Sequence, residues 1–340
     1  MSKHTFARPN LWDFLGLLIV SFSCMSFELL IIRCLSLIMW YHFAFMVISI
    51  AMLGLGAAGT TIAVFQKTRF FKNNKVPAWS SMFLGLAMVI AVISMTKIHP
   101  DMYQLGMKPV ELFYLSLLYL VLSLPFFMTG LTVAFLLKET PEYAPRLYGI
   151  DLLGAGIGCW TVIPLQEWLG APRSILLISF LAVLGAGVFA ISRKSKVLWL
   201  CGMFAMSFLM VSFTESEIFI LKPGPDKMLS FFSKNSTSPY RYFFRTAQKK
   251  IAVDQMSEYD PAGNWPGIKI LKTEWDILCR IDAAAYSDWH PIYGIGAPSS
   301  YCGTLPDQIM ITQDGDAATF ITKHTGDYSK LDFIDHFLYG

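Results

Sequence analysis

Charged residues are scarce in this sequence. Asp, Glu, Lys and Arg together make up 15% of its 340 residues, whereas hydrophobic residues make up 54%. Soluble globular domains typically contain about 25% charged residues. Much of the chain is therefore not expected to fold as an ordinary water-soluble globule, and the lipid bilayer is its expected surrounding.

The sequence also lacks the common signatures of catalytic and ligand-binding sites. Its histidines are scattered, its six cysteines include no C-x-x-C pair, and neither G-x-S-x-G nor H-E-x-x-H occurs. No basic segment with interleaved aromatic residues stands out, which argues against nucleic-acid binding. We therefore expect no metal site and assign no catalytic residue.

Long apolar runs are abundant instead. A membrane-spanning helix needs roughly 17 to 25 such residues, and seven segments meet this requirement. No small-residue cleavage site follows the first, so we expect it to be a retained helix rather than a signal peptide. The predicted spans are Leu11–Ile32, Leu35–Phe65, Ala78–Met95, Val110–Leu137, Tyr148–Leu169, Ser174–Ile191 and Val197–Phe213.

The composition changes after Lys222, where proline, glycine and asparagine interrupt a polar stretch that has no run of spanning length. We predict an α-helical polytopic membrane bundle over residues 1–221 and a small antiparallel β-rich soluble domain over residues 222–340. The first region carries 15 basic and 10 acidic side chains, and the second carries 12 and 14.

Basic residues between the predicted spans indicate an orientation. With the N-terminus in the cytoplasm, eleven Lys and Arg residues fall on the cytoplasmic side, and four fall on the other side: Arg33, Lys97, Lys108 and Arg173. This distribution follows the positive-inside rule. An odd number of spans then places the soluble domain outside the cytoplasm.

Three glycines in the second predicted span have the G-x-G-x-x-G spacing of a dinucleotide-binding turn: Gly54, Gly56 and Gly59. That turn requires a preceding strand and an acidic residue about 20 positions downstream. Here the glycines lie inside an apolar run, and the next acidic residue is Asp101. We predict that they let helices pack closely.

Small residues four apart on a membrane helix allow two backbones to approach each other. On this basis Gly54 with Ala58, and Gly56 with Thr60, are predicted contact surfaces. The same prediction applies to the glycines of the fifth span, which are Gly154, Gly156 and Gly158.

Ionisable residues inside the predicted spans are few. Glu28 lies deep in the first span and Asp151 near the start of the fifth. A carboxylate in hydrocarbon needs a partner or a proton. Arg33 lies on a different helix face from Glu28, so we expect it to reach another helix or the membrane interface. We favour interhelical hydrogen bonding for the two acids over a substrate or proton pathway.

Two patterns indicate strands in the second region. Residues 273–285 alternate apolar and polar side chains, as a half-buried strand does. Residues 308–321 place an Asp314–Gly315 turn between two apolar segments, which predicts a hairpin. Residues 331–340 begin an amphipathic segment.

Several stretches resemble bacterial membrane-anchored polyamine aminopropyltransferases, the spermidine synthase-like proteins with an N-terminal multi-span region. The most distinctive is YGIDLLG at residues 148–154. The likeness extends to SFELLIIR, FFMTGLTVAFLL, RLYGIDLLGAGIGCWTVIPLQEWLGAPRS, WDILCRIDAA and ITQDGDAATFI.

The resemblance implies an N-terminal β-domain followed by a Rossmann-like domain that uses decarboxylated S-adenosylmethionine as co-substrate. We expect this second domain to be absent from the chain. The resemblance makes Asp314, Asp316 and His336 candidates for substrate binding. Turn geometry alone explains an Asp-Gly pair, so we favour a structural role for the hairpin.

Three functions stay open at this point. The chain is predicted to be the membrane region and β-domain of a spermidine synthase-like protein, not catalytic alone, in a bacterial inner membrane. Alternatively, it transports or binds a small cation or a polyamine through Glu28 and Asp151. The third possibility is an anchor for a separate catalytic chain or a homo-oligomer. S-adenosyl cofactors are expected in the cytoplasm, so the side of the soluble domain is unresolved.

Overall fold

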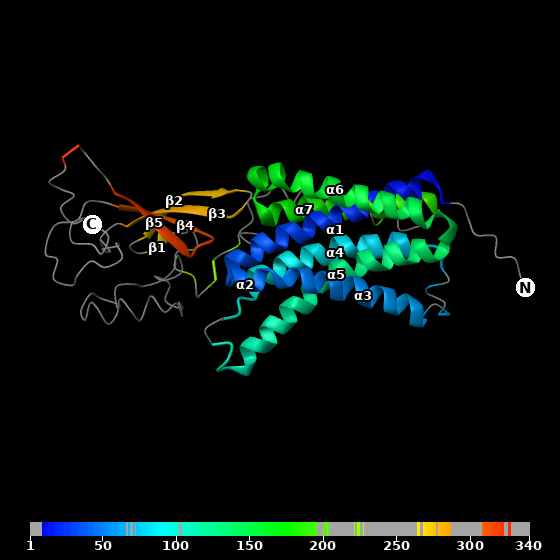
Figure 1. The fold of residues 1–340 in the computed structure, drawn as a ribbon, viewed down its shortest axis with the longest axis horizontal. Coiled ribbons are helices and arrows are strands. Elements are labelled where there is room, and N and C mark those ends of the chain that lie inside the picture. The colour runs from blue at the N-terminus through cyan, green and yellow to red at the C-terminus, as the bar shows by residue number, and fades with distance from the viewer. Residues whose placement is uncertain are drawn as a thin grey trace, which may run out of the picture.

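The computed structural model consists of a helical bundle with an antiparallel sheet at one end (Figure 1). Its described residues are 9–65, 67–68, 71, 73–101, 104–195, 200, 202, 204, 221, 223–224, 227, 264–265, 268–276, 278–286, 308–322 and 326–327.

The bundle is built from helices that pack lengthwise. They are α1 (Leu11–Ile38), α2 (Tyr41–Ala44), α3 (Met46–Phe65), α4 (Val76–Lys97), α5 (Pro109–Glu139), the 3-10 helix η1 (Pro141–Tyr143), α6 (Ala144–Leu169) and α7 (Ala171–Ser192).

Six helices of the described part are long and apolar enough to cross a membrane: α1, α3, α4, α5, α6 and α7. This is the architecture of a multi-pass membrane protein. The seventh predicted span stays a prediction, because most of residues 197–213 lie outside the described residues. Within that segment Leu200, Gly202 and Phe204 are helical.

Helix α1 is the common packing partner of the bundle. It contacts α6 and α7 along much of its length and also touches α3, α4 and α5. Side chains from Leu17 to Leu37 on its buried faces are fully enclosed, among them Phe27, which packs on Phe126 of α5. A helix that is apolar around most of its circumference is typical of a central membrane helix.

The boundary between the first two predicted spans was wrong. We expected the second span to begin at Leu35, but Leu35–Ile38 continue α1, and the chain breaks at Met39 and Trp40, where the backbone is extended. No proline or glycine marks this break, and the apolar run continues through it. Composition alone therefore could not locate it.

Three of the glycine predictions are confirmed by close helix contacts. A Cβ atom on Gly54 would lie 2.7 Å from Cβ of Phe126, and one on Gly158 would lie 2.7 Å from the carbonyl oxygen of Phe22. Gly154 likewise packs directly on the backbone of Leu18. These glycines bring α3 against α5 and α6 against α1.

The prediction was wrong for three other glycines. Gly56, Gly59 and Gly156 would have nothing within 4 Å of an added Cβ atom. The Thr60 hydroxyl donates to the carbonyl oxygen of Gly56 in its own helix. The spacing of the glycines was right for close packing, but the rotation of each helix decides which glycine faces a neighbour.

The sheet is a meander of sequential antiparallel strands. They are β1 (Asn264–Trp265), β2 (Ile268–Trp275), β3 (Arg280–Tyr286), β4 (Gln308–Gln313) and β5 (Ala317–Thr322), in the order β1-β2-β3-β4-β5. This confirms the prediction of an antiparallel β-region after the bundle.

The predicted hairpin is present. β4 and β5 pair with Ile309 opposite Ile321 and Gln313 opposite Ala317. Asp314 and Gly315 both have positive φ, at 50° and 73°, as a tight hairpin turn of the primed type requires.

The prediction of one strand over residues 273–285 was wrong. β2 ends at Trp275, a turn follows, and β3 begins at Arg280. Arg280 and Asp282 are buried, whereas Ile281 is 36% exposed, so the buried face of β3 carries the polar residues. The apolar-polar alternation continued through the turn and hid it.

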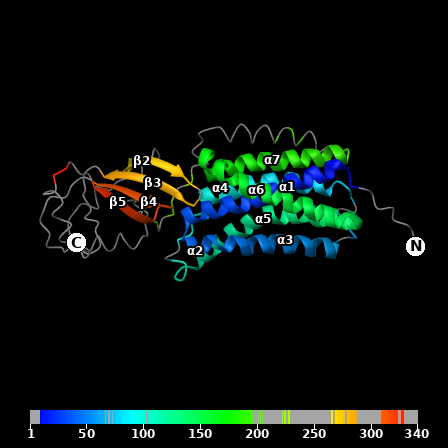
Figure 2. The ribbon, with the colours of Figure 1, turned by 45° about the horizontal axis from the view of Figure 1, so that its top comes forward.

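The sheet lies at the end of the bundle opposite to the N-terminus, as both views show (Figures 1 and 2). This is where α1 and α6 end and α7 begins.

Candidate functional site

The turn between β2 and β3 docks on the ends of two membrane helices. Nη1 of Arg33, in α1, donates to the carbonyl oxygen of Leu278 at 2.7 Å. The side-chain amide of Gln166, in α6, donates to the carbonyl oxygen of Asp276. Because both acceptors are backbone atoms of one short turn, the helices fix its position independently of its side chains.

The corner between α6 and α7 receives a tryptophan from the sheet. Gly170 forms this corner with φ of 74°, and the indole of Trp275 lies against it. A Cβ atom on Gly170 would come within 2.9 Å of the indole Nε1. Glycine is needed here both for the backbone conformation and for the close approach.

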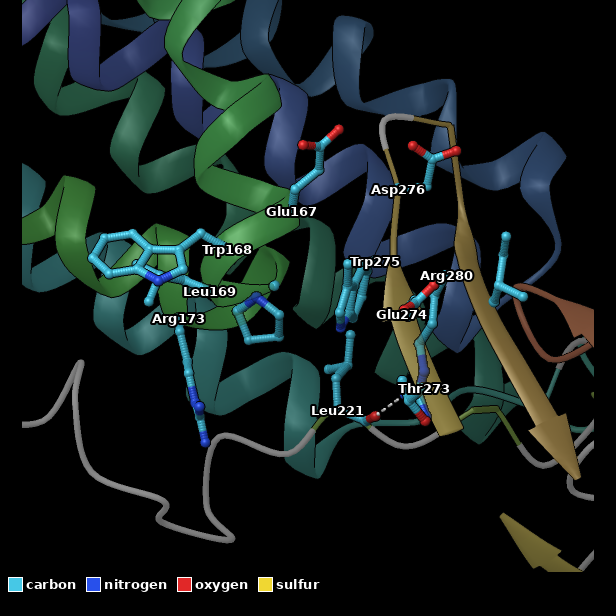
Figure 3. Close-up of a pocket in the computed structure, with 13 residues that line it drawn as sticks. Glu167, Trp168, Leu169, Arg173, Leu221, Thr273, Glu274, Trp275, Asp276 and Arg280 are labelled. Carbon is cyan, nitrogen blue, oxygen red and sulfur yellow. Dashed lines mark hydrogen bonds between the residues drawn. The ribbon is translucent and has the colours of Figure 1, made fainter. Parts of the chain in front are cut away.

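A cavity of about 840 Å³ opens at this junction. Figure 3 shows Glu167 and Trp168 from the end of α6, Arg173 from the first turn of α7, and Trp275 and Arg280 from the sheet around it. This is the junction pocket. It lies at the end of membrane-spanning helices, where the headgroup layer of a bilayer would meet the protein.

The charges around the junction pocket are mixed. Glu274 pairs with Lys272 at 2.5 Å, whereas Glu167 and Arg173 form no ion pair within the described part of the chain. The exposed indole of Trp168 adds apolar surface, while the half-buried indole of Trp275 is already covered by the Arg280 guanidinium. The pocket can therefore hold a polar organic group, but its charges favour neither a cationic nor an anionic ligand.

A buried ion pair supports the pocket from the sheet side. Nη2 of Arg280 lies 2.8 Å from Oδ1 of Asp282, and its Nη1 donates to the carbonyl oxygen of Leu221 at 2.9 Å. The hydroxyl of Thr273 donates to the same carboxylate oxygen at 2.6 Å. The guanidinium also lies over the Trp275 ring. Arg280 thus joins two strands to the segment that follows the bundle.

The hairpin turn adds a further contact to the junction. Asp314 accepts a hydrogen bond from the backbone N–H of Arg280 at 2.9 Å and returns one from its own N–H at 2.8 Å. Burial raises the pKa of Asp314, while the hydrogen bonds from Arg280 and Ser36 and the charges of Lys227 and Arg33 act in the opposite direction. This carboxylate therefore holds the hairpin against β3 and the end of α1.

Cys279 is the nearest thiol to this junction, and it is buried. Burial raises its pKa, the carboxylates of Asp314 and Asp276 raise it further, and Arg33 lowers it. A thiol with a raised pKa is a poor nucleophile at neutral pH. The Cys279 thiol is thus not activated as a nucleophile.

The predicted intramembrane acids lie along α1. Asp151 of α6 accepts a hydrogen bond from the hydroxyl of Ser21, which is the interhelical contact that the packing interpretation predicted. Glu28 is half-buried and makes no hydrogen bond or ion pair with any described residue. Both carboxylates lie within electrostatic reach of Cys24. Arg33 instead reaches the sheet.

The proposed substrate-binding residues do not converge in the described structure. Asp314 lies at the junction, while Asp316 is half-buried at the hairpin turn, where its N–H donates to the carbonyl oxygen of Gln313. His336 and the amphipathic segment 331–340 lie outside the described residues. No three His, Cys, Asp or Glu side chains of the described chain are grouped as metal ligands.

Sequence reasoning missed the residues that make the junction. Gln166 and Gly170 lie at the end of an apolar run, and Trp275 and Arg280 flank the overlooked turn. A glutamine within a spanning segment is a signal that could have been used, because its amide needs a partner. Its partner, the carbonyl oxygen of Asp276, lies 110 positions away, so no local sequence pattern predicts it.

Comparison of the chain with protein-family models, curated proteins and solved structures found no match.

Proposed function

We propose that the chain is the membrane region and N-terminal β-domain of a spermidine synthase-like aminopropyltransferase. The bundle anchors the β-domain at one membrane surface and fixes its orientation. The observation that carries this proposal is the docked β2–β3 turn, held by Arg33 and Gln166 through backbone carbonyls. A domain attached by a loose linker would not need these contacts.

In this proposal the chemistry belongs to a Rossmann-like domain that binds decarboxylated S-adenosylmethionine. An amine of the polyamine substrate attacks the aminopropyl carbon, a C–N bond forms, the C–S bond breaks, and methylthioadenosine leaves. The attacking amine loses a proton to a base of that domain. The role of residues 1–340 is to hold the β-domain, and with it the polyamine that accepts the aminopropyl group, at the membrane.

An aminopropyl-transfer assay tests the proposal. Purified 1–340 in nanodiscs should form no spermidine from putrescine and decarboxylated S-adenosylmethionine. Addition of a separately produced aminopropyltransferase Rossmann-like domain should give turnover that is lost when Arg33 and Gln166 are both replaced by alanine. Turnover by 1–340 alone would contradict the proposal. So would turnover that is unchanged in the double variant.

We further propose that the protein lies in a bacterial inner membrane with its N-terminus in the cytoplasm. The excess of basic residues on that side supports this orientation. A seventh crossing by residues 197–213 would put the β-domain on the opposite side, whereas use of a cytoplasmic S-adenosyl co-substrate requires it in the cytoplasm. A reporter fused before Met1 should be active in the cytoplasm, and its inactivity there would refute the orientation. A reporter fused after Gly340 decides the side of the β-domain, and activity only outside the cytoplasm would contradict the aminopropyltransferase proposal.

A second candidate function is binding or transport of a small cation or a polyamine. It is favoured by the position of Glu28 and Asp151, both near Cys24 in the bundle. Uptake into vesicles should then be lost in the double variant Glu28→Gln/Asp151→Asn without loss of folded protein.

A further inference from the structure

The junction pocket has the size of a ligand site. Its volume of about 840 Å³ falls within the range of roughly 300 to 1,000 Å³ that small-molecule sites occupy. Figure 3 shows Trp168 and Arg173 on the helix side of the pocket and Trp275 with Arg280 on the sheet side. Because the docking contacts hold both sides in place, the space is formed before any ligand enters it.

Part of the charge around the junction pocket is already neutralised. Arg280 is paired with the buried Asp282, and Glu274 is paired with Lys272. Asp276 belongs to the docked turn, whose carbonyl oxygen Gln166 holds. These groups build the wall of the pocket and are not the ones that we expect to select a ligand.

Glu167 and Arg173 are the charges that stay available to a ligand. Glu167 is exposed on the last turn of α6, and Arg173 is half-buried on the first turn of α7. Neither forms an ion pair with any described residue, and in Figure 3 the two side chains extend in opposite directions. Burying part of a charged group is costly unless the charge is paired. A ligand with a negative and a positive group would pair both.

An exposed apolar stripe on α6 leads to the junction pocket. Trp160, Pro164 and Trp168 recur every four residues and so share a helix face. All three are exposed, the two indoles at 84% and 71%, and α6 is the least buried of the described spanning helices. Trp168 also lines the pocket. In a bilayer this face meets lipid chains, and Trp168 lies where tryptophan is enriched, at the level of the headgroups.

We propose that the junction pocket binds the headgroup of a zwitterionic phospholipid. The guanidinium of Arg173 binds the phosphate, the carboxylate of Glu167 binds the ammonium group, and the acyl chains lie along the α6 stripe. Phosphatidylglycerol lacks the ammonium group and leaves Glu167 without a counter-charge. The junction serves only as the scaffold of this site, so the proposal does not depend on the aminopropyltransferase role.

Lipid binding in detergent provides a direct test. The whole chain is stripped of lipid and titrated with phosphatidylethanolamine, phosphatidylcholine or phosphatidylglycerol, and bound lipid is counted by native mass spectrometry. A zwitterionic lipid should bind saturably, about tenfold or more tightly than phosphatidylglycerol, which lacks a charged contact. The tighter of the two zwitterionic lipids identifies the preferred ammonium group. Equal binding of phosphatidylglycerol, or binding without saturation, would overturn the proposal.

Free headgroups separate a lipid site from a site for a soluble zwitterion. Glycerophosphoethanolamine and glycerophosphocholine carry the same charges without acyl chains. They should displace the bound lipid only at concentrations about a hundredfold or more higher, because they bury no chain against the α6 stripe. A free headgroup that binds as tightly as the lipid would contradict the assignment to a membrane lipid.

Variants assign the binding to these side chains. Arg173→Gln should weaken zwitterionic lipid binding about tenfold or more, because a charge-assisted contact is lost. Glu167→Gln should abolish the preference over phosphatidylglycerol while binding of phosphatidylglycerol itself is unchanged. Arg146→Gln, at an exposed position on the first turn of α6 at the other end of the bundle, is the matched control. Equal weakening in Arg146→Gln and Arg173→Gln would refute the site.

Photocrosslinking of the unmodified chain gives a readout that does not need variants to fold. The chain is reconstituted in nanodiscs with the preferred zwitterionic lipid carrying a diazirine on one acyl chain, and crosslinks are mapped by peptide mass spectrometry. They should concentrate between Trp160 and Trp168 and be suppressed by the same lipid without diazirine, but not by phosphatidylglycerol. Crosslinks spread evenly over the spanning helices, or suppressed equally by both lipids, would refute the site.

Discussion

The two ends of the helical bundle are both closed by arginines, but the arginines bind different partners. At the end where the chain begins, Arg193 lies 3.3 Å from Asp13 of α1 and 2.7 Å from Glu139 of α5. Arg193 also donates to the carbonyl oxygen of Asn74 at 2.8 Å. At the sheet end, Arg33 joins α1 to the sheet through the carbonyl oxygen of Leu278, and Arg280 joins Asp282 of its own strand to the carbonyl oxygen of Leu221.

This difference separates two tasks. Side-chain ion pairs tie helices of the same bundle to one another, and their strength depends on burial and geometry. Backbone carbonyls offer an acceptor whatever the local sequence, so they suit the docking of a separate domain. The first end holds the bundle together, and the second positions the sheet on it.

Loss of Arg193 should produce the largest effect. Its side chain is 8% exposed and faces two carboxylates, so Arg193→Met should lower the free energy of unfolding by about 3 to 5 kcal/mol. Chemical unfolding in detergent, followed by labelling of the buried Cys34, measures this change. Lys194→Met, a change at the exposed neighbouring residue, is the control. An equal loss of unfolding free energy in that variant would show that the loss in Arg193→Met does not come from the two ion pairs.

Loss of Arg280 should act on the sheet rather than on the bundle. Arg280→Met leaves the fully buried Asp282 without its cation and should destabilise the sheet domain by about 3 kcal/mol. Labelling of Cys279 should accelerate while that of Cys34 is unchanged. The double variant Arg280→Met/Asp282→Leu should recover most of the loss, since it removes the charge pair as a whole.

The glycine contacts allow a matched comparison within α6. Gly154→Ala places a methyl group against the backbone of Leu18 and should cost about 1 to 3 kcal/mol. Gly156→Ala meets open space and should be neutral or slightly stabilising in the same unfolding assay. Equal effects would show that α6 does not pack on α1 by this face.

The Arg33 contact should contribute less, because it is exposed. Arg33→Gln removes one hydrogen bond to Leu278 and should weaken docking of the sheet by about 1 kcal/mol. The measurement is the rate of Cys279 labelling at fixed temperature, which should increase several-fold. An unchanged rate would mean that Gln166 and Trp275 hold the turn without it.

Asp314 should make the junction mildly dependent on pH. Since burial raises the pKa of Asp314 above its ordinary value of 3.8, the folded chain binds this proton more tightly than the unfolded chain does. Its contribution to stability is complete below that value and is lost as the pH rises through the raised pKa. Asp314→Asn keeps the turn, because asparagine tolerates positive φ.

In unfolding curves recorded across this range, the Asp314→Asn protein should gain stability relative to the unmodified chain as the pH rises. A difference that stays constant with pH would show that Asp314 does not titrate in a buried setting.

Local patterns predicted much of the fold. The length of the apolar runs predicted the six spanning helices of the described structure. An Asp-Gly pair between two apolar segments predicted the β4–β5 hairpin. The break at Met39 and the turn after Trp275 were missed because the apolar run and the polar alternation continue through them. The site was harder to predict from the sequence, because Gln166 and Arg33 bind partners that are distant in the chain.

The sequence alone determined that the chain forms membrane helices followed by a small antiparallel sheet. Spanning length and turn chemistry are properties of neighbouring residues, which the sequence displays directly. Only the tertiary structure decided that Gly154 packs while Gly156 does not, and that Arg33 meets a carbonyl 245 positions away. These outcomes depend on how each helix is rotated and where the sheet docks, and both are set by packing between distant segments.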